Sequence, residues 1–279
     1  MHSTYYPQAF YNEHAPFPVQ WLRNLSDAGH IAPGVVDGRD IQDVEPQQVI
    51  DSTQAHFFAG VGAWSYALRL AGWPDDVPVW TGSCPCQPFS TAGRRKGKDD
   101  ARHLWPDWFR LISECRPPVI FGEQVASPDG RAWLAAVSAD LETLGYAVAG
   151  ADLCAASVGA PHTRQRLFFV GYANGDDTGG NGGTRTGTKA QSSGERIEDG
   201  YKRHPFGASS GVCCPLWKSV DWVECGDGKA RPIEPGTFPL VDGATARVGR
   251  LRAYGNAIVP QVAATFIQAA IGAINDASA

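Results

Sequence analysis

The stretch at residues 55–71, AHFFAGVGAWSYALRLA, predicts a strand and a helix joined by a glycine-rich turn. Residues 55–59 are mostly apolar and predict a short strand, which opens through GVGAW into a helix with one apolar face. The residues expected on that face are Ala67, Leu68, Leu70 and Ala71. Because a strand that turns at spaced glycines into a helix is the repeating unit of doubly wound sheets, this stretch predicts an α/β fold.

The same alternation of short apolar runs and longer helical patterns continues on both sides of this stretch. Further strands are expected at residues 5–11, 35–41, 77–82, 119–122, 147–153 and 166–170. Helices are expected at residues 16–28, with Val19, Leu22 and Leu25 near one face, and at residues 105–114, 132–144 and 263–274. The pattern therefore predicts a doubly wound sheet of the Rossmann-like kind, with helices between its strands.

The composition changes after residue 171. Residues 174–211 include GDDTGGNGGTRTGT and SSGER and hold few apolar side chains, so we expect this segment to be flexible. Tryptophans and prolines return at residues 213–239, as in a small irregular module. We expect one main domain made of residues 1–171 and 247–279, with a smaller region at residues 172–246.

The chain has 279 residues, seven cysteines and a formal net charge of −5. Its first ten residues do not resemble a signal peptide, and no apolar run approaches the length of about 18 residues that spans a membrane. We therefore expect a cytoplasmic protein without a membrane partner, whose cysteines are free thiols, metal ligands or catalysts.

The charge distribution bears on nucleic-acid binding more than the net charge does. Residues 1–150 hold 11 basic against 17 acidic side chains, whereas residues 151–279 hold 13 against 12. A local basic cluster, GRRKGKDDAR, lies at residues 93–102. This cluster fits a face that contacts phosphates, and equally a solvated loop.

The glycines of FAGVG (residues 58–62) would let a ligand approach the backbone at the start of a helix. The full G-x-G-x-x-G pattern is incomplete, because its third glycine position holds Ser65, and a plain tight turn is the alternative. A nucleotide-like ligand also needs acids at neighbouring strand ends. Glu13 is placed to accept from ribose hydroxyls and Asp40 from an adenine amino group, although each is also compatible with a surface carboxylate.

Two cysteines flank a proline in TGSCPCQPFS (residues 81–90), just past a predicted strand. The spacing of Cys84 and Cys86 is too tight for a C-x₂-C zinc site, and a disulfide between them would be strained. Two roles remain for these cysteines: a nucleophile and a thiol packed in the core. A separate zinc site is open to Cys213, Cys214, Cys225 and His204, although two adjacent ligands argue against it.

Three more polar side chains are expected at the same edge of the sheet. Glu123 ends the predicted strand in FGEQV, where a carboxyl group held protonated would donate to a ring nitrogen. Arg164 and Arg166 in HTRQR alternate toward one side at the mouth of another strand, fit to orient an anion or a polar base.

These motifs together resemble those of C5-cytosine DNA methyltransferases, over most of the chain. FAGVG resembles the cofactor glycine loop of that family, PCQPFS its catalytic loop and GEQV its glutamate motif. HTRQR resembles the paired-arginine motif, and YGNAIVPQVA (residues 254–263) the final cofactor motif.

The resemblance implies that the thiolate of Cys86 adds to C6 of a flipped cytosine, with Glu123, Arg164 and Arg166 around the base. Carbon 5 then takes the methyl group of S-adenosylmethionine, and Cys84 packs. The implied cofactor-binding residues are Phe58, Ala59, Gly60, Gly62, Glu13, His14, Asp40, Ile41, Pro85, Asn256 and Ala257. The implied substrate-binding residues, in or before a mobile loop at residues 90–102, are Gln87, Ser90, Arg94 and Arg95.

The resemblance also implies double-stranded DNA as partner, no metal, target choice by the region at residues 172–246, and a restriction endonuclease as a further partner. We expect a monomer. An RNA cytosine methyltransferase and a catalytically silent DNA-binding relative remain alternatives.

The chain departs from the family pattern in four respects. Only 21 residues separate Gly62 from Cys84, too few for the ribose-acid and adenine-acid units that follow the glycine loop in the family. YNEHAPFPVQWL and GRDI resemble these units but precede the loop, so we expect a permuted order. His56, Gln124 and His162 stand where the family usually has Asp, Asn and Gln.

Overall fold

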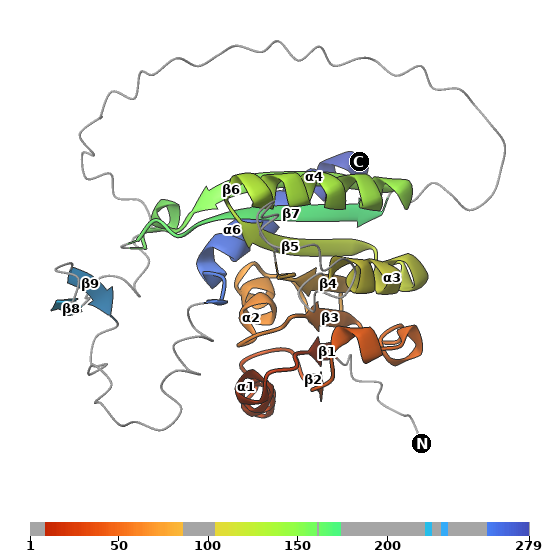
Figure 1. The fold of residues 1–279 in the computed structure, drawn as a ribbon, viewed down its shortest axis with the longest axis horizontal. Helices are drawn as coiled ribbons and strands as arrows, with labels where there is room; N and C mark the ends of the chain where they lie inside the picture. The colour runs from red at the N-terminus through yellow and green to blue at the C-terminus, as the bar shows by residue number, and fades with distance from the viewer. Residues whose placement is uncertain are drawn as a thin grey trace, which may run out of the picture.

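The computed structural model describes residues 9–85, 104–160, 162–173 and 256–278, and the backbone of strands at 221–224 and 230–233. A seven-stranded sheet with the order β2-β1-β3-β4-β5-β7-β6 forms the centre of the molecule (Figure 1). Its strands are β1 (Ala9–Asn12), β2 (Gly34–Asp37), β3 (Gln54–Phe57), β4 (Val79–Gly82), β5 (Val119–Val125), β6 (Tyr146–Cys154) and β7 (Gln165–Ala173). The pairings from β2 through β5 are parallel, and β7 runs antiparallel to both β5 and β6. The predicted α/β fold is confirmed.

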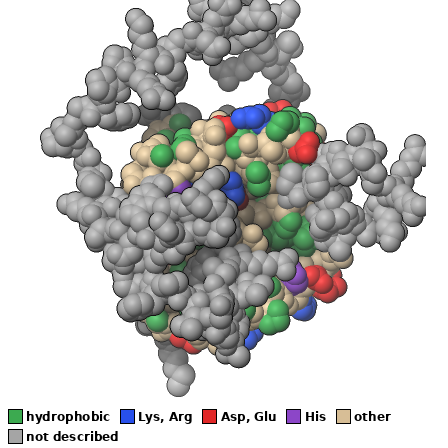
Figure 2. Space-filling model, turned by 60° about the vertical axis from the view of Figure 1, so that its left-hand side comes forward, with side chains coloured by type: hydrophobic (Ala, Val, Ile, Leu, Met, Phe, Trp, Pro, Cys, Tyr) green, Lys and Arg blue, Asp and Glu red, His purple; other side chains and the backbone are tan. Residues whose placement is uncertain are grey.

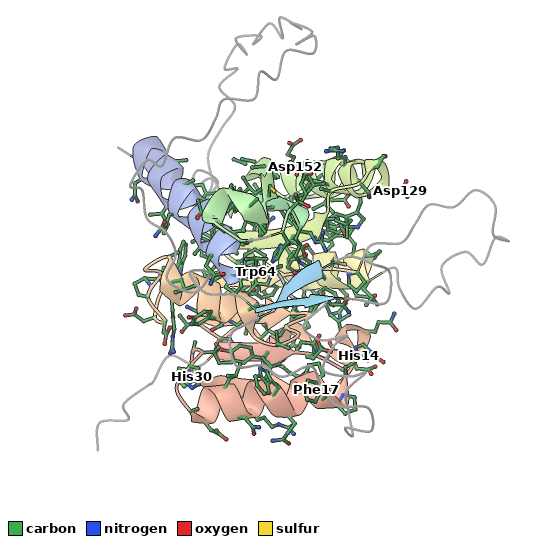
Figure 3. The ribbon with its side chains drawn as sticks, turned by 90° about the vertical axis from the view of Figure 1, so that its left-hand side faces the viewer. His14, Phe17, His30, Trp64, Asp129 and Asp152 are labelled. Atoms are coloured by element: carbon green, nitrogen blue, oxygen red, sulfur yellow. The ribbon has the colours of Figure 1, made fainter. Side chains whose placement is uncertain are left out.

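Helices cover both faces of this sheet, which accounts for the apolar character of its central strands. One face carries α1 (Pro16–Asp27), α2 (Ala63–Leu70) and α6 (Pro260–Ser278). The other carries α3 (Trp105–Cys115), α4 (Pro128–Thr143) and the short helices η1 (Ile41–Asp43) and η2 (Pro46–Gln48). In Figure 3, α2 and α6 lie on the opposite side of the strands from α3 and α4. A further short helix, η3 (Ala155–Val158), follows β6.

Two other strands, β8 (Asp221–Glu224) and β9 (Ala230–Ile233), pair antiparallel within the region predicted to be a small module. The segment predicted to be flexible, residues 174–211, lies outside the described residues. Among the helices that the structure describes, none is both long and apolar enough to cross a membrane.

The predicted strand at residues 35–41 is wrong at its end, because β2 stops at Asp37. The carboxylate of Asp37 accepts a hydrogen bond from the backbone N–H of Arg39 at 3.0 Å, which turns the chain away from the sheet. Asp40 therefore follows the strand instead of belonging to it, and Ile41 begins η1.

The predicted apolar face of α2 is also partly wrong. Ala67 and Leu68 are buried as expected, but Leu70 is 42% exposed. The helix turns by about 100° per residue, so Leu70 lies on the far side from Leu68. The buried face begins earlier, at Trp64 and Ser65.

Two central strands use glycine where aromatic rings press on the backbone. A Cβ atom added to Gly122 of β5 would lie 2.1 Å from the ring of Phe169. A Cβ atom at Gly82 of β4 would lie 2.6 Å from the ring of Trp108. These contacts let α3 and β7 pack tightly against the strands that lead to the carboxyl edge of the sheet.

Gly122→Ala is expected to destabilise the fold, because the ring of Phe169 must move to admit the methyl group. Overpacking of this kind costs about 1–3 kcal/mol of unfolding free energy. The control is Gly272→Ala in α6, where nothing lies within 4 Å of the added atom, so that stability stays equal or rises slightly. Urea unfolding of both variants tests this, and equal midpoints for the two would contradict it.

Candidate active site at the carboxyl edge of the sheet

The predicted site residues that the structure describes gather at the edge where β1 to β5 end. Glu13 follows β1, Phe58 follows β3, Ser83 follows β4, and Glu123 lies near the end of β5. Because β7 is antiparallel, its first residues reach the same edge, and Arg166 lies opposite Val125. Figure 3 looks toward this edge, with Trp64 near its centre and His14 to one side.

The glycine loop between β3 and α2 has a backbone shape that few side chains tolerate. Gly60 has φ of 54° and Gly62 has φ of 81°, both in the left-handed region. Phe58 shares this region with φ of 51°, which is uncommon for a bulky residue. Its ring packs edge-on against Trp108, with 6.0 Å between ring centroids. The N–H groups of Ala59 and Gly62 bind carbonyl oxygens of Asn12 and Ala59, so the loop is also fixed by hydrogen bonds at the start of α2.

Glu13 connects the end of β1 to the glycine loop. Its Oε2 atom accepts a hydrogen bond from the backbone N–H of Gly60, and its Oε1 atom one from Ala15, each at 2.9 Å. A carboxylate accepts about four hydrogen bonds, so Glu13 retains acceptor capacity toward a ligand. The structure thus joins two elements that the sequence predicted to share one site. The neighbouring His14 is exposed.

A hydrogen bond connects the residue before Glu13 to the residue before Asp40. The side-chain amide of Asn12, at the end of β1, donates to the carbonyl oxygen of Arg39 at 2.9 Å. Asp40 is exposed, whereas Ile41 at the start of η1 is buried in the core.

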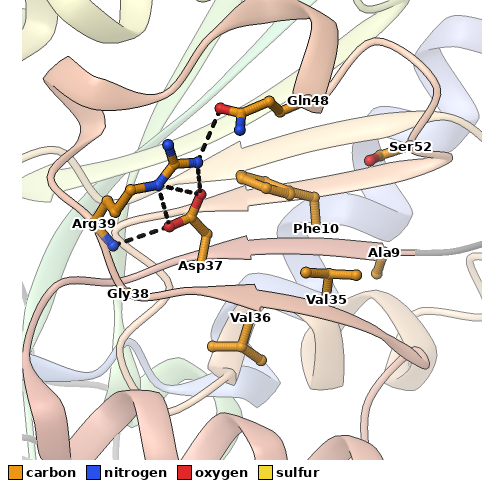
Figure 4. Close-up of a pocket in the computed structure, with 9 residues that line it drawn as sticks. All are labelled: Ala9, Phe10, Val35, Val36, Asp37, Gly38, Arg39, Gln48 and Ser52. Carbon is orange, nitrogen blue, oxygen red and sulfur yellow. Dashed lines mark hydrogen bonds and ion pairs between the residues drawn. The ribbon is translucent and has the colours of Figure 1, made fainter.

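A cavity of roughly 390 Å³ opens beside this turn, lined by β1, β2, Gln48 and Ser52 (Figure 4). Arg39 lines it and is held by Asp37 and by Gln48, whose Oε1 atom lies 2.9 Å from the guanidinium. The pKa of Asp37 is lowered chiefly by its hydrogen bond with Arg39. This arginine is therefore already paired in the described structure.

The chemical centre of the edge is a buried ion pair between Glu123 and Arg166. The Nε atom of Arg166 lies 2.9 Å from the Oε1 atom of Glu123, which is 7% exposed. Burial raises the pKa of Glu123, against the charges of Arg166 and Arg164 and a hydrogen bond from Ser83. A carboxyl group balanced in this way is suited to exchanging a proton or hydrogen bond with a polar base.

Arg164 connects this centre to the segment at residues 254–263, which the sequence predicted to bind the cofactor. Its guanidinium donates to the carbonyl oxygen of Ala257 at 2.6 Å. Burial and the nearby charge of Arg166 lower the pKa of Arg164. Asn256, next to this contact, is exposed at the start of the segment that leads into α6. The two predicted arginines therefore lie at one site, where Arg166 binds Glu123 and Arg164 binds the backbone of Ala257.

The two cysteines of the opening motif differ in what the structure describes. Cys84 is 2% exposed in the core against α3, and its carbonyl oxygen accepts a hydrogen bond from Gln124 at 3.1 Å. The prediction that Cys84 packs is confirmed. Pro85 is exposed, and the described chain stops there. Cys86, Gln87, Ser90, Arg94 and Arg95 lie outside the described residues, as do the predicted phosphate-contacting cluster at 93–102 and the four candidate zinc ligands.

Among the described residues, no group of three histidine, cysteine or acidic side chains is placed to hold a metal ion. Figure 2 shows this side of the molecule obliquely, and there the basic atoms of the described surface are separated by neutral and apolar ones.

His56, one of the departures from the family pattern, is fully enclosed beneath the glycine loop. Its Nδ1 atom lies 2.8 Å from the hydroxyl of Thr81, and its ring stacks on Tyr11 at 4.8 Å between centroids. Burial lowers its pKa to about 3, so the imidazole is neutral. The second departure, Gln124, holds Cys84, and burial also lowers the pKa of the third, His162.

Three residues at this edge were missed by the sequence interpretation. Ser83 bonds to Glu123, Trp64 bonds to Ser83, and Asn12 holds the turn before Asp40. Ser83 immediately precedes the cysteine motif, which is the one signal that the sequence offers. The other two roles depend on contacts between distant segments.

The fold and the site define a class of protein: an α/β protein with a glycine loop between a strand and a helix, and an acid–arginine pair at the same edge of the sheet. Comparison with known proteins narrows this class. A profile of the C-5 cytosine-specific DNA methylase family matches residues 67–204. Residues 67–204 of the chain are therefore similar to this family.

Curated relatives are similar to the chain over a limited length. The type II methyltransferase M.AgeI of Thalassovita gelatinovora is 39% identical over 105 residues, which cover 37% of this chain and 24% of that protein. M.NgoMIV of Neisseria gonorrhoeae is 35% identical over 103 residues, covering 36% and 33%. The chain therefore matches between a quarter and a third of the length of these relatives. The solved structure of S. pombe Dnmt2 methyltransferase is similar with 16% identity and a TM-score of 0.36, covering 60% of this chain and 51% of that chain.

The neutral His56 predicts a specific loss of stability in acid. The unfolded chain binds a proton at this residue below about pH 6.5, whereas the folded chain binds it only near pH 3. The unfolding free energy should therefore fall by about 1.4 kcal/mol per pH unit as the pH drops from 6.5 toward 3. Urea unfolding at a series of pH values measures this slope.

His56→Asn is the matched variant, because an amide keeps a hydrogen-bonding group toward Thr81 but does not titrate. Between pH 6.5 and 4, the unfolding free energy of this variant should decline less steeply. The two slopes should differ by the contribution of one proton, about 1.4 kcal/mol per pH unit. Parallel curves for the two proteins would show that His56 is not the residue responsible.

Proposed function

We propose that this chain is a DNA (cytosine-5-)-methyltransferase that transfers a methyl group from S-adenosylmethionine to carbon 5 of a flipped cytosine. The observation that most supports this is the buried Glu123–Arg166 pair, 2.9 Å apart, next to the strand that leads through Ser83 and Pro85 to Cys86. The match of residues 67–204 to the C-5 cytosine-specific DNA methylase family supports the same reaction.

The described edge fits S-adenosylmethionine by its donor and acceptor chemistry. The glycine loop turns through positive φ angles at Phe58, Gly60 and Gly62, and glycines without a Cβ atom let a ligand lie close to the backbone. Glu13 offers carboxylate lone pairs to the ribose hydroxyls, and Asp40 an exposed carboxylate to the adenine amino group. Within the same proposal, Ala59, His14, Ile41, Pro85, Asn256 and Ala257 complete the binding surface. When bound, the cofactor supplies an electrophilic methyl group.

Cys86 is the proposed nucleophile. Its thiolate forms a bond to carbon 6 of the cytosine, which places electron density on carbon 5, the atom that takes the methyl group. Loss of the proton from carbon 5 and release of the thiolate then restore the aromatic ring. Because carbon 6 is inaccessible in a stacked duplex, the base has to leave the helix first.

Glu123 and the two arginines act on the opposite edge of the base in this proposal. Glu123 contacts ring nitrogen 3 and the exocyclic amine, and stabilises the charge that builds there as sulfur adds. Its raised pKa favours a proton on this carboxyl group compared with an exposed one. Arg166 holds the carboxylate, and Arg164 and Arg166 orient the base or a nearby phosphate.

We further propose that the chain order is permuted. Glu13 follows β1 in the chain, and Asp40 follows β2. In the sheet, β1 lies between β2 and β3, and β3 leads into the glycine loop. This neighbourhood is what a cofactor site requires, whichever of the strands comes first in the chain. The family profile begins at residue 67, after the glycine loop, which fits such an order.

The remaining assignments are part of the same proposal. Residues 1–171 and 247–279 form the catalytic domain, and residues 172–246 select the target sequence. Gln87, Ser90, Arg94 and Arg95 contact DNA. The protein acts as a monomer in the cytoplasm, and its similarity to type II methyltransferases suggests a restriction endonuclease as partner.

Methyl transfer from radiolabelled S-adenosylmethionine tests the reaction. Label is expected at carbon 5 of cytosine in plasmid DNA, and Cys86→Ala should lose at least 1,000-fold in rate because the covalent step is gone. Cys84→Ala is the control, since this thiol packs in the core. Label only in bulk tRNA offered in parallel would favour an RNA substrate, and binding of cofactor without transfer would favour a silent relative.

Glu13→Ala is expected to weaken binding of S-adenosylmethionine. The substitution removes an acceptor for the ribose and also releases the N–H of Gly60 in the loop. Loss of a charged hydrogen bond costs about 1.5–3 kcal/mol, which is about 10- to 100-fold in Kd. Isothermal titration calorimetry measures this, with Glu114→Gln on the far helix α3 as control. Unchanged affinity in Glu13→Ala would remove this residue from the cofactor site.

A further inference from the structure

The hydroxyl of Ser83 lies between an indole and the carboxyl group of the proposed site. The Nε1 atom of Trp64 is 3.0 Å from the Oγ atom of Ser83. The register of β4 against β5 pairs Gly82 with Gly122, so Ser83 lies beside Glu123, and its hydrogen bond lowers the pKa of that carboxyl group. Ser83 follows β4, Glu123 lies in β5, and Trp64 is the second residue of α2, so three separate elements meet at this hydroxyl.

The chemistry of the three groups fixes the direction of both hydrogen bonds. An indole N–H only donates, so Ser83 accepts from Trp64. The single hydroxyl proton of Ser83 is then directed to Glu123, whose ionised carboxylate only accepts. The Oε1 atom of Glu123 is bound by Arg166. Two donors from different strands therefore restrain one buried carboxylate.

Trp64 is a rigid donor in this arrangement. Its side chain is 3% exposed and stacks on Phe121 with 6.4 Å between centroids, while Phe168 meets it edge-on at 6.0 Å. The residue lies two positions after Gly62, where the glycine loop passes into α2. Through Ser83, the indole thus connects the start of α2, next to the proposed cofactor loop, to the carboxylate of Glu123.

We propose that Ser83, oriented by Trp64, is a positioning residue that holds the Glu123 carboxylate in place for the target base. This inference rests on the proposed function, since it deepens the role given there to Glu123. Ser83 itself does not touch the reacting atoms. Its hydroxyl fixes the rotamer of Glu123 and stabilises the ionised form, so that base binding and not solvent decides when the carboxyl group takes a proton.

The groups that face Glu123 oppose each other in their effect on its proton. Burial favours the protonated form and raises the pKa, whereas Arg166, Ser83 and Arg164 favour the ionised form. Removing the Ser83 hydroxyl leaves both arginines in place and should raise the pKa of Glu123 further. A hydrogen bond to a charged group is worth enough to change the acid dissociation constant about tenfold.

The first test needs no substrate. Protein labelled with carbon-13 at the glutamate side-chain carboxyl groups is titrated by NMR, and the Glu123 signal is assigned by its loss in Glu123→Gln. Ser83→Ala should shift the titration midpoint of this signal to a higher pH, at which the proton concentration is about tenfold lower. Trp64→Phe, which keeps an aromatic ring in the core, should shift it in the same direction by less, and Ser83→Thr should restore the original midpoint.

The control is Ser65→Ala. Ser65 is a buried serine next to Trp64, but its hydroxyl bonds to Tyr11 and Ala32 and not to Glu123. It should lose a similar amount of thermal stability and leave the Glu123 midpoint unchanged. If Ser65→Ala moves the midpoint as far as Ser83→Ala does, or if Ser83→Ala titrates like the original protein, the inference is overturned.

The second test uses methyl transfer to DNA. Ser83→Ala should lower kcat about tenfold, with little change in KM for S-adenosylmethionine, and should move the limb of the pH profile that depends on Glu123 toward higher pH. A drop in kcat with an unmoved pH profile would count against a positioning role. If the original protein transfers no methyl group at all, the proposed function fails, and the NMR titration alone still decides whether Ser83 controls Glu123.

Discussion

The buried ion pair between Glu123 and Arg166 depends on one feature of the sheet, the antiparallel register of β7 against β5. In that register Glu123 lies opposite Phe168, and Arg166 follows on the same face one pleat away. Phe168 is enclosed between α2 and α6, so a slip of one residue would remove it from this cluster and carry the arginine to the face that α4 covers. Apolar burial therefore sets the position of a charge. In return, an arginine lost from this site would leave a buried carboxylate uncompensated, at a cost of about 3–5 kcal/mol.

The neighbouring half of the edge uses a different principle, in which each loop is restrained by the end of another strand. Glu13 binds the backbone of the glycine loop, and Asn12 binds the backbone of the turn before Asp40. Side chains that hydrogen-bond to backbone groups hold a loop regardless of the sequence of that loop. This arrangement accounts for the tolerance of unusual residues such as Phe58 in the left-handed region. Preorganisation at this edge thus comes from β1 as much as from the glycines.

Much of this fold could be predicted from the sequence because its strands and helices have distinct apolar periods. Glu123 could be placed in the site, since a polar residue at the end of an apolar strand points to the carboxyl edge of the sheet. The extent of β2 was wrong because a local hydrogen bond of Asp37 ended the strand within an otherwise strand-like run. The prediction that Leu70 is buried was wrong because the buried face of α2 begins at Trp64.

The roles of Ser83 and Trp64 could not be predicted for a different reason. Their contact joins residues 19 positions apart, and the next one joins Ser83 to another strand. No periodicity encodes such a chain of hydrogen bonds, because it depends on how α2 is seated against β4 and β5. Sequence motifs identify the groups that react, and the groups that hold them become visible only in three dimensions.

The contact between Arg164 and Ala257 has a consequence for how the protein matures during synthesis. It joins residues 93 positions apart, and α6, which follows Ala257, packs on α2 near the start of the chain. A ribosome-bound chain that lacks α6 would leave the apolar face of the cofactor-loop helix open to solvent. The site is thus complete only after α6 has been synthesised and has packed on α2.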